Sequence, residues 1–297
     1  GGPTCLVFDD EVLLVCDRDG GRILTVDGEV ILSGLDHPHG MLLLGNAVII
    51  SEEGKLTRYD YNFENPEVLV QGIPSGNHQT NAVNLLPNGT LIWHSGSTCN
   101  HCNEDDSRNA ALLWVNATTG EHGILATGVR NSFDGVWVDE IGYLFTDNGQ
   151  DAEGNDFPNE EVNLLVDGAD YGWLVESKSD PNPDGTEAPV ATWTPHTSVN
   201  GMTTRPANMP GDKYTVYATV YGSWATILPA GHQILKIDFT QTDDGWVGDV
   251  EIFAEDVGTP LPITGGPDGN LYYATFDHGG SVHVISPEAN WWTSSSD

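Results

Sequence analysis

The chain has 297 residues, with 10 Lys or Arg against 44 Asp or Glu, which gives a formal net charge of −34 at pH 7. Because 38% of the residues are hydrophobic, the chain is too apolar for a disordered acidic segment, and we expect an acidic solvated surface around an ordinary core. Such a surface repels nucleic acid, and no apolar run approaches the roughly 18 residues of a membrane span, so neither a nucleic acid nor a membrane span is expected.

A unit of two alternating strands recurs along the chain, as in "EVLLVCDRDGGRILTVDG" and "NAVIISEEGKLTRYD". Its copies begin at Val12, Ala47, Thr90, Tyr143, Thr215 and Leu271. The intervals run from 35 residues, between 12 and 47, to 72 residues, between 143 and 215. Repeats of this length are typical of propeller blades with loop insertions. We predict a single all-β domain over residues 1–297, a six-bladed β-propeller whose last blade lacks an obvious fourth strand.

An outer strand ending at Gly leads into each inner strand, as in "ILATGVRNSFDGVWV". Innermost strands line the channel of a propeller, so residues that enter them should collect around one mouth of its axis. The polar residues at these places are His37, His39, His78, Arg130, Asn131 and His196. A lone histidine at a strand entry is usually structural, but several that converge by repeat position indicate a ligand or catalytic site.

The four cysteines form two close pairs, Cys5 with Cys16 and Cys99 with Cys102. The second pair is a CxxC without a partner CxxC, so a zinc site would need further ligands, and a local disulfide or paired thiols are favoured. Paired cysteines and two glycosylation sequons favour an exported protein, with a cytoplasmic location left open. The acidic, Lys-poor composition is typical of a protein from a high-salt environment.

Several motifs together resemble the glucose/sorbosone dehydrogenase family: "GNHQTNAVNLLPNG", "GSTCNHCNEDD", "GVRNSFDGVWV", "TDNGQD" followed by "NEEVNLLVDGADYGW", and "YGSW". The resemblance covers about residues 78–239 with ordered spacing and is weak elsewhere. It implies a soluble six-bladed propeller that binds pyrroloquinoline quinone (PQQ) with calcium and oxidises sugars. The implied partners are a small sugar substrate and an electron acceptor that the sequence does not identify.

The resemblance also implies residue roles. His78 would be the general base, since a near-neutral imidazole can take a proton from a hydroxyl at little cost. Arg130 would face the quinone oxygens as a fixed cation, and Asn131 would help to hold them. The backbone carbonyls of Gly149 and Gln150 would be calcium ligands, because hard cations prefer oxygen.

Other residues are given weaker roles by the same resemblance. His196 matches a histidine at the next blade entry, and Trp224 would wall the pocket. Asp151, Glu160 and Glu161 are carboxylates that could support the ion or the base, although in so acidic a chain each is by default a solvated surface charge.

The chain also departs from the family pattern. Tyr221 replaces the usual histidine of "HGSW", and Asp134 adds one residue to the arginine motif. The positions at which basic residues are common carry Ala225, Thr226, Gln233 and Ser281. Few cations therefore remain for a tricarboxylate cofactor.

These departures leave two alternatives open. One is a calcium-dependent propeller hydrolase or lactonase, in which His78 activates water beside an axial ion held by Asn81, Asn131, Asn148 and Asp134. The other is a binding module without catalysis that has lost PQQ and kept the fold.

Overall fold

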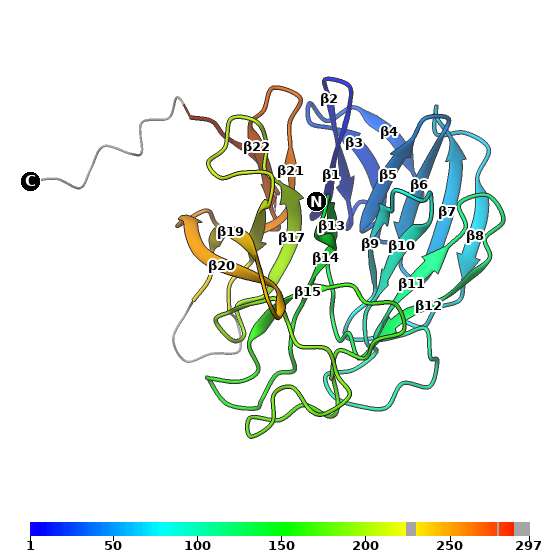
Figure 1. Cartoon of the computed structure of the whole chain (residues 1–297). Helices are drawn as coiled ribbons and strands as arrows, with labels where there is room; N and C mark the ends of the chain where they lie inside the picture. Colours follow the sequence, from blue (N-terminus) through cyan, green and yellow to red (C-terminus); the bar gives the residue numbers. More distant parts are fainter. Residues whose placement is uncertain (224–229, 278, 288–297) are drawn as a thin grey trace, which may run out of the picture.

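The computed structural model describes residues 1–223, 230–277 and 279–287. These residues form six antiparallel sheets that fan around a central axis, with no helix among them (Figure 1). The predicted all-β, six-bladed propeller is therefore confirmed. In this described part of the chain, no helix is present that would be long and apolar enough to cross a membrane.

Each blade is built from strands that follow one another in the chain. Blade 1 contains β1 (Pro3–Asp9), β2 (Val12–Asp17), β3 (Arg22–Thr25) and β4 (Val30–Ser33). Blade 2 contains β5 (Gly40–Leu44), β6 (Ala47–Glu52), β7 (Lys55–Asp60) and β8 (Glu67–Gln71). Blade 3 contains β9 (Thr80–Leu85), β10 (Leu91–Ser95), β11 (Ala111–Val115) and β12 (His122–Thr127). Blade 4 contains β13 (Gly135–Val138), β14 (Gly142–Asp147), β15 (Glu160–Leu164) and β16 (Ala191–Trp193). Blade 5 contains β17 (Val199–Thr204), β18 (Thr215–Val220), β19 (Gln233–Thr242) and β20 (Gly245–Ala254). Blade 6 contains β21 (Pro260–Gly265), β22 (Leu271–Thr275) and β23 (Val282–Ile285).

The first strand of each blade is the innermost, and neighbouring first strands touch all the way around the ring. The ring closes where β21 packs against β1. Blade 6 has three strands among the described residues, as the sequence predicted, and blade 1 takes all four of its strands from the N-terminal end. Side-chain packing between blades 6 and 1, rather than a shared sheet, closes the propeller.

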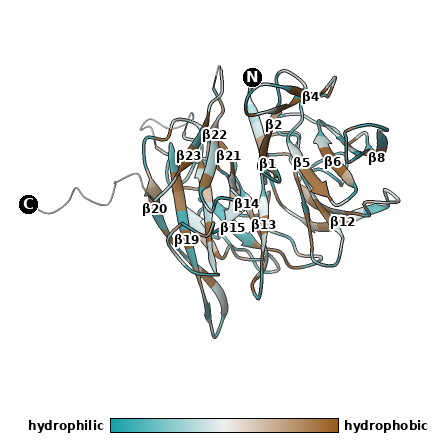
Figure 2. Cartoon of the chain, turned by 90° about the horizontal axis from the view of Figure 1, so that it is seen from above, coloured by the Kyte–Doolittle hydropathy of each residue, from teal (hydrophilic) through white to brown (hydrophobic). Residues whose placement is uncertain are grey.

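The core consists of six hydrophobic clusters, one between each pair of adjacent blades. A middle strand is covered on both faces, so β6 is buried at all six positions and reads as a nearly continuous apolar run. Figure 2 shows such hydrophobic stretches along strands, for example β5. Trp93, which has no exposed surface, fills the space between blades 2 and 3.

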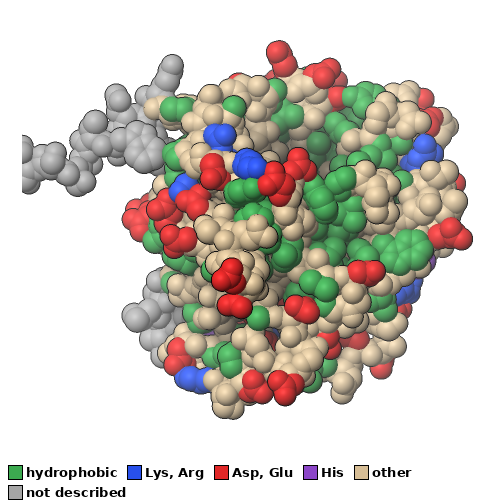
Figure 3. Space-filling view, viewed as in Figure 1, with side chains coloured by type: hydrophobic (Ala, Val, Ile, Leu, Met, Phe, Trp, Pro, Cys, Tyr) green, Lys and Arg blue, Asp and Glu red, His purple; other side chains and the backbone are tan. Residues whose placement is uncertain are grey.

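On the face drawn in Figure 3, acidic side chains are scattered over the surface with few Lys or Arg among them. Not every acid is solvated. Glu52 has no exposed surface and pairs with Lys55 at 2.9 Å. Glu160 is only 3% exposed, so the default expectation of a solvated charge at this position is wrong. Burial of Glu160 follows from its place at the start of β15, between two blades.

Antiparallel pairing places two sets of residues at one mouth of the axis. The start of each first strand lies beside the end of the second strand, as in the pairs Gly40 with Ser51 and Val199 with Val220. Residues that enter a first strand and residues that leave a second strand therefore meet at the same end of the propeller. The candidate site is built from both sets.

Candidate active site

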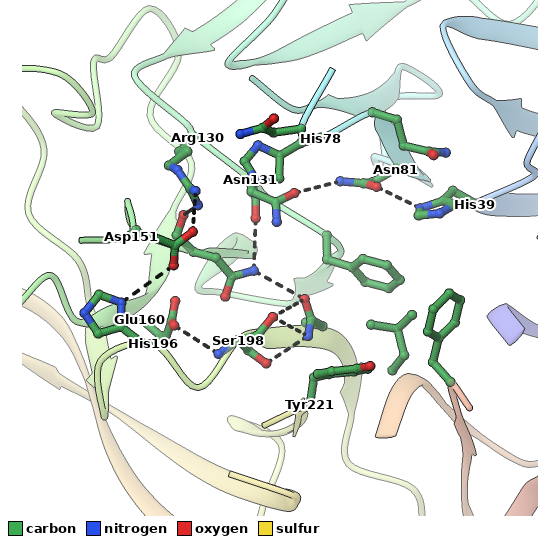
Figure 4. Close-up of a pocket in the computed structure, with 18 of the residues that line it drawn as sticks. His39, His78, Asn81, Arg130, Asn131, Asp151, Glu160, His196, Ser198 and Tyr221 are labelled. Carbon is green, nitrogen blue, oxygen red and sulfur yellow. Dashed lines mark hydrogen bonds and ion pairs between the residues drawn. The ribbon is translucent and has the colours of Figure 1, made fainter. Parts of the chain in front are cut away.

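A cavity of about 400 Å³ opens at this mouth, and Figure 4 shows the polar side chains that line it. The structure brings together here the predicted residues His39, His78, Arg130, Asn131, Gly149 and His196. Gln150 is buried next to this lining rather than within it. Trp224, Ala225 and Thr226 lie outside the described residues.

His78 is half-buried, two residues before β9 begins. Its Nδ1 lies 2.8 Å from the hydroxyl of Ser97, and that hydroxyl donates to the carbonyl of Cys99 at 2.8 Å. Gly96 leaves room for the ring, because a Cβ at this position would lie 2.6 Å from the Cβ of His78. Burial, and then the charge of Arg130, lowers the pKa of His78 to about 3, so the imidazole is neutral at pH 7.

Arg130 is 4% exposed, and backbone and side-chain oxygens hold its guanidinium. Nε donates to the carbonyl of Asn100 at 3.0 Å, and Nη2 donates to the Asn100 side-chain oxygen at 2.8 Å. Nη1 donates to the carbonyl of Asn148 at 3.0 Å, and Asp151 completes the set with an ion pair at 3.5 Å. The result is a fixed cation in the cavity wall, which suits an anionic ligand.

Asn81 links Asn131 to His39 across the cavity wall (Figure 4). Its amide nitrogen donates to the carbonyl of Ser132 at 2.8 Å and to Asn131 Oδ1 at 3.4 Å. Its oxygen therefore faces His39 Nδ1 at 2.8 Å, and His39 must donate there. The other ring nitrogen, Nε2 of His39, is buried without a partner. Burial lowers the pKa of His39 to about 3, so this second imidazole is also neutral.

Blade 4 contributes buried carboxylates beside Arg130. Asp147 accepts hydrogen bonds from the backbone N–H groups of Arg130 at 2.9 Å, Asn131 at 2.7 Å and Asn148 at 2.9 Å, which fixes the arginine motif to the end of β14. Burial raises the pKa of Asp147, Glu160 and Glu161. A nearby cation would favour their ionised forms.

The same region fits a hard cation by the chemistry of its donors. Three buried side-chain oxygens there lack a hydrogen-bond partner: Asn148 Oδ1, Gln150 Oε1 and Glu160 Oε2. Calcium takes carboxylate, amide and backbone oxygens of this kind. Gly149 lies between two of these residues, and its missing side chain matters, because a Cβ would lie 2.2 Å from Pro158 Cγ.

His196 supports the loop that follows β14. Its Nε2 lies 2.7 Å from the carbonyl of Gly154 and 3.0 Å from that of Phe157, so this nitrogen donates to both. Its Nδ1 lies 4.0 Å from Asp151. His196 thus borders the cavity and also holds its wall.

Sequence reasoning missed four residues that leave second strands: Arg18, Glu53, Ser97 and Phe276, of which all except Ser97 line the cavity. Asn148 and Tyr221 also leave second strands and line the cavity, and the sequence had named both, Asn148 as a ligand of an axial ion and Tyr221 as a departure from the family pattern. Arg18 matters most, since it adds a second cation from blade 1 and contacts Gln79 at 3.4 Å. In an antiparallel sheet, the residue that enters a first strand lies beside the residue that leaves the second strand. This pairing was the signal that could have identified them.

Both cysteine pairs are disulfides, Cys5 with Cys16 and Cys99 with Cys102, which confirms the favoured local disulfide in the CxxC. The first joins paired positions of β1 and β2 inside the core. The second lies in the connection between β10 and β11, next to the cavity.

No protein-family model matches the chain. An uncharacterized protein from Borreliella burgdorferi is 26% identical over 244 residues, which cover 72% of this chain and 62% of that protein. The chain therefore spans less than two thirds of the length of this curated relative.

Solved structures similar to the chain include enzymes whose names refer to carbohydrates or sugars. The holo form of the PQQ domain of a pyranose dehydrogenase from Coprinopsis cinerea is 18% identical, with a TM-score of 0.76 over 96% of this chain and 92% of that one. A calcium structure of a carbohydrate-active enzyme of family AA12 from Trichoderma reesei is 16% identical, with a TM-score of 0.76 over 96% and 93%. The apo form of the soluble aldose sugar dehydrogenase from Escherichia coli is 16% identical, with a TM-score of 0.72 over 97% and 96%. At these identities the chain shares the fold of such enzymes over nearly its whole length.

Proposed function

We propose that the protein is a PQQ- and calcium-dependent dehydrogenase that oxidises an aldose or a related hydroxyl compound. The observation that carries the proposal is a single cavity lined by a neutral imidazole, His78, and by a fixed cation, Arg130. The shared fold with PQQ-binding and sugar-oxidising propellers supports it. Arg18 supports it further, because it partly replaces the cations that the chain lacks at other positions.

Oxidation of the hydroxyl removes a proton from oxygen and a hydride from carbon, and leaves a carbonyl. When bound, PQQ supplies the carbon that accepts the hydride. His78 takes the proton from the substrate hydroxyl on its unprotonated ring nitrogen. Arg130 and Arg18 stabilise the negative charge of the ligand. The carbonyls of Gly149 and Gln150, with the unpartnered oxygens beside them, would hold calcium, which would supply a positive charge next to the ligand.

The test is a titration of PQQ into calcium-loaded protein, followed by its absorbance while a panel of aldoses is added. We expect saturable binding and sugar-dependent bleaching. Arg130→Ala should abolish binding, because it removes the buried cation. Arg58→Ala is the control: Arg58 is partly exposed in blade 2 and pairs with Glu67, away from the cavity.

Absence of PQQ binding at saturating calcium would refute the proposal. Turnover of lactones by the calcium-loaded, quinone-free protein would instead identify a hydrolase. Sugar binding without turnover of any substrate would identify a binding module.

A further inference from the structure

The connection between β10 and β11 passes beside the cavity and carries the Cys99–Cys102 disulfide. Asn100 lies between the two cysteines and contacts both Arg130 and the neighbouring loop. Its carbonyl and side-chain oxygen accept hydrogen bonds from Arg130 at 3.0 and 2.8 Å. The same side chain binds the backbone of Asp151 in both directions, at 2.8 and 3.1 Å. One residue of the disulfide loop therefore holds two of the three guanidinium nitrogens of Arg130, and Asn148 holds the third.

Cys99 acts on His78 through Ser97. A carbonyl can only accept, so the single hydroxyl proton of Ser97 goes to Cys99 O, at 2.8 Å. Ser97 Oγ must then accept from His78 Nδ1, also at 2.8 Å. Neutral His78 accordingly carries its proton on Nδ1 and keeps a lone pair on Nε2. This tautomer is the one that leaves Nε2 free to accept a proton.

We propose that the Cys99–Cys102 disulfide loop is a clamp that positions both His78 and Arg130, so that opening the disulfide disables the site while the propeller stays folded. The catalytic consequence rests on the proposed function, whereas the clamp itself does not. Cys99, Asn100 and Ser97 are positioning residues, since they act through the two side chains that line the cavity.

The location of the loop explains why the disulfide matters there. Cys99 and Cys102 are half-exposed and lie outside any strand. Beside them, the carboxylate of Glu104 accepts hydrogen bonds from the backbone N–H of Thr98 at 2.8 Å and from its hydroxyl at 2.6 Å. Cys5 and Cys16, in contrast, are buried in paired strands whose ladder continues without a break from Cys5 to Asp9. Loss of the Cys99–Cys102 bond therefore frees a loop, whereas loss of the other bond leaves the β1–β2 ladder intact.

Opening the clamp is a two-electron reduction. A thiolate of a small dithiol attacks one sulfur of the exposed disulfide and forms a mixed disulfide. The second thiol of the reagent then displaces the protein sulfur. The protein gains two electrons and two protons as two thiols, and the reagent is oxidised to its cyclic disulfide.

The experiment is ¹⁵N nuclear magnetic resonance of histidine-labelled protein near pH 7 without cofactor, with His78 assigned from its absence in His78→Gln. In the wild type, His78 should show a protonated Nδ1 and an unprotonated Nε2. In the double variant Cys99→Ala/Cys102→Ala this signature should be lost or averaged. The matched control, Cys5→Ala/Cys16→Ala, should keep it. The control removes the longer of the two disulfide-closed loops, 11 residues of separation against 3, so general loosening would affect it at least as much.

Ser97→Ala should also lose the Nδ1–H signature, and Ser97→Thr should restore it by keeping the hydroxyl. Partial reduction of the wild type, with alkylation at Cys99 and Cys102 alone confirmed by mass, opens the same loop without a mutation. An unchanged His78 signature in the opened protein would overturn the clamp, and so would its equal loss in the Cys5–Cys16 control. These readouts need no quinone, so a protein that binds no PQQ would refute the proposed function and leave the clamp test intact.

Discussion

Two regions at the cavity hold largely buried titratable groups of opposite kinds. Blades 2 and 3 present the imidazoles of His39 and His78, the histidine wall. Blade 4 carries the carboxylate wall, in which Glu160 lines the cavity while Asp147 and Glu161 line an adjoining pocket together with Arg130 and Gly149. Burial has the largest influence on the pKa values of the groups in both walls. It lowers the pKa of each imidazole to about 3 and raises the pKa of each carboxyl group.

The difference separates two tasks. The histidine wall is neutral at pH 7 and needs no partner to remain so, which leaves an unprotonated ring nitrogen to accept a proton, although a pKa of about 3 makes each imidazole a weaker base than a free histidine. The carboxylate wall, which already has Arg130 beside it, ionises fully near neutral pH only if a further positive charge joins it. We therefore assign proton transfer to the histidine wall and cation binding to the carboxylate wall, and the predictions below test that division.

The largest effect should come from His78→Ala. We expect turnover of aldoses to fall by about 10²- to 10⁴-fold, the usual contribution of a general base, while PQQ binding persists because Arg130 is untouched. The measurement compares cofactor affinity with kcat. His122→Ala, an exposed histidine of β12, is the control and should behave as wild type. Equal activity in the two variants would remove the histidine wall from the chemistry.

The carboxylate wall should make the free energy of unfolding depend on pH. The pKa of Glu160 and of Glu161 rises from 4.5 to about 8 in the native state, so the native state binds more protons than the unfolded chain between these values. The free energy of unfolding should therefore decrease as pH rises through this window when chelator removes divalent ions. Glu161→Gln should make this decrease with pH smaller, and it should raise the free energy of unfolding at pH 8.5 by roughly 1–3 kcal/mol.

Denaturant unfolding in chelator from pH 6 to pH 8.5 measures this slope. Glu67→Gln is the matched control, because Glu67 is an exposed residue at the start of β8. Calcium should reduce the slope in the wild type and have less effect in Glu161→Gln. If both glutamate variants kept the wild-type slope, the carboxylate wall would not be the source of the pH dependence.

The sequence predicted the blades because each middle strand repeats an apolar pattern between turns. It placed His78 and Arg130 at one mouth because both enter innermost strands. Arg18 and Ser97 escaped prediction because they leave second strands, and only the antiparallel register brings those ends to the same mouth. The burial of Glu160 was hidden among 44 acids, since scattered charge carries no information about which carboxylates enter an interface between blades.

The smallest effect should be at Arg18, the cation that blade 1 adds to the cavity. Its side chain is 29% exposed, against 5% for Arg130, so solvent screens its charge more strongly. We expect Arg18→Gln to weaken PQQ binding by about 3- to 10-fold, which is roughly 1 kcal/mol, and the loss to shrink in molar KCl. Arg58→Gln is matched in exposure at 27% and in having an acidic partner, and it should leave affinity unchanged. A loss at Arg18 as large as that at Arg130 would mean that the anionic ligand lies between the two walls, rather than against the arginine beside the carboxylates.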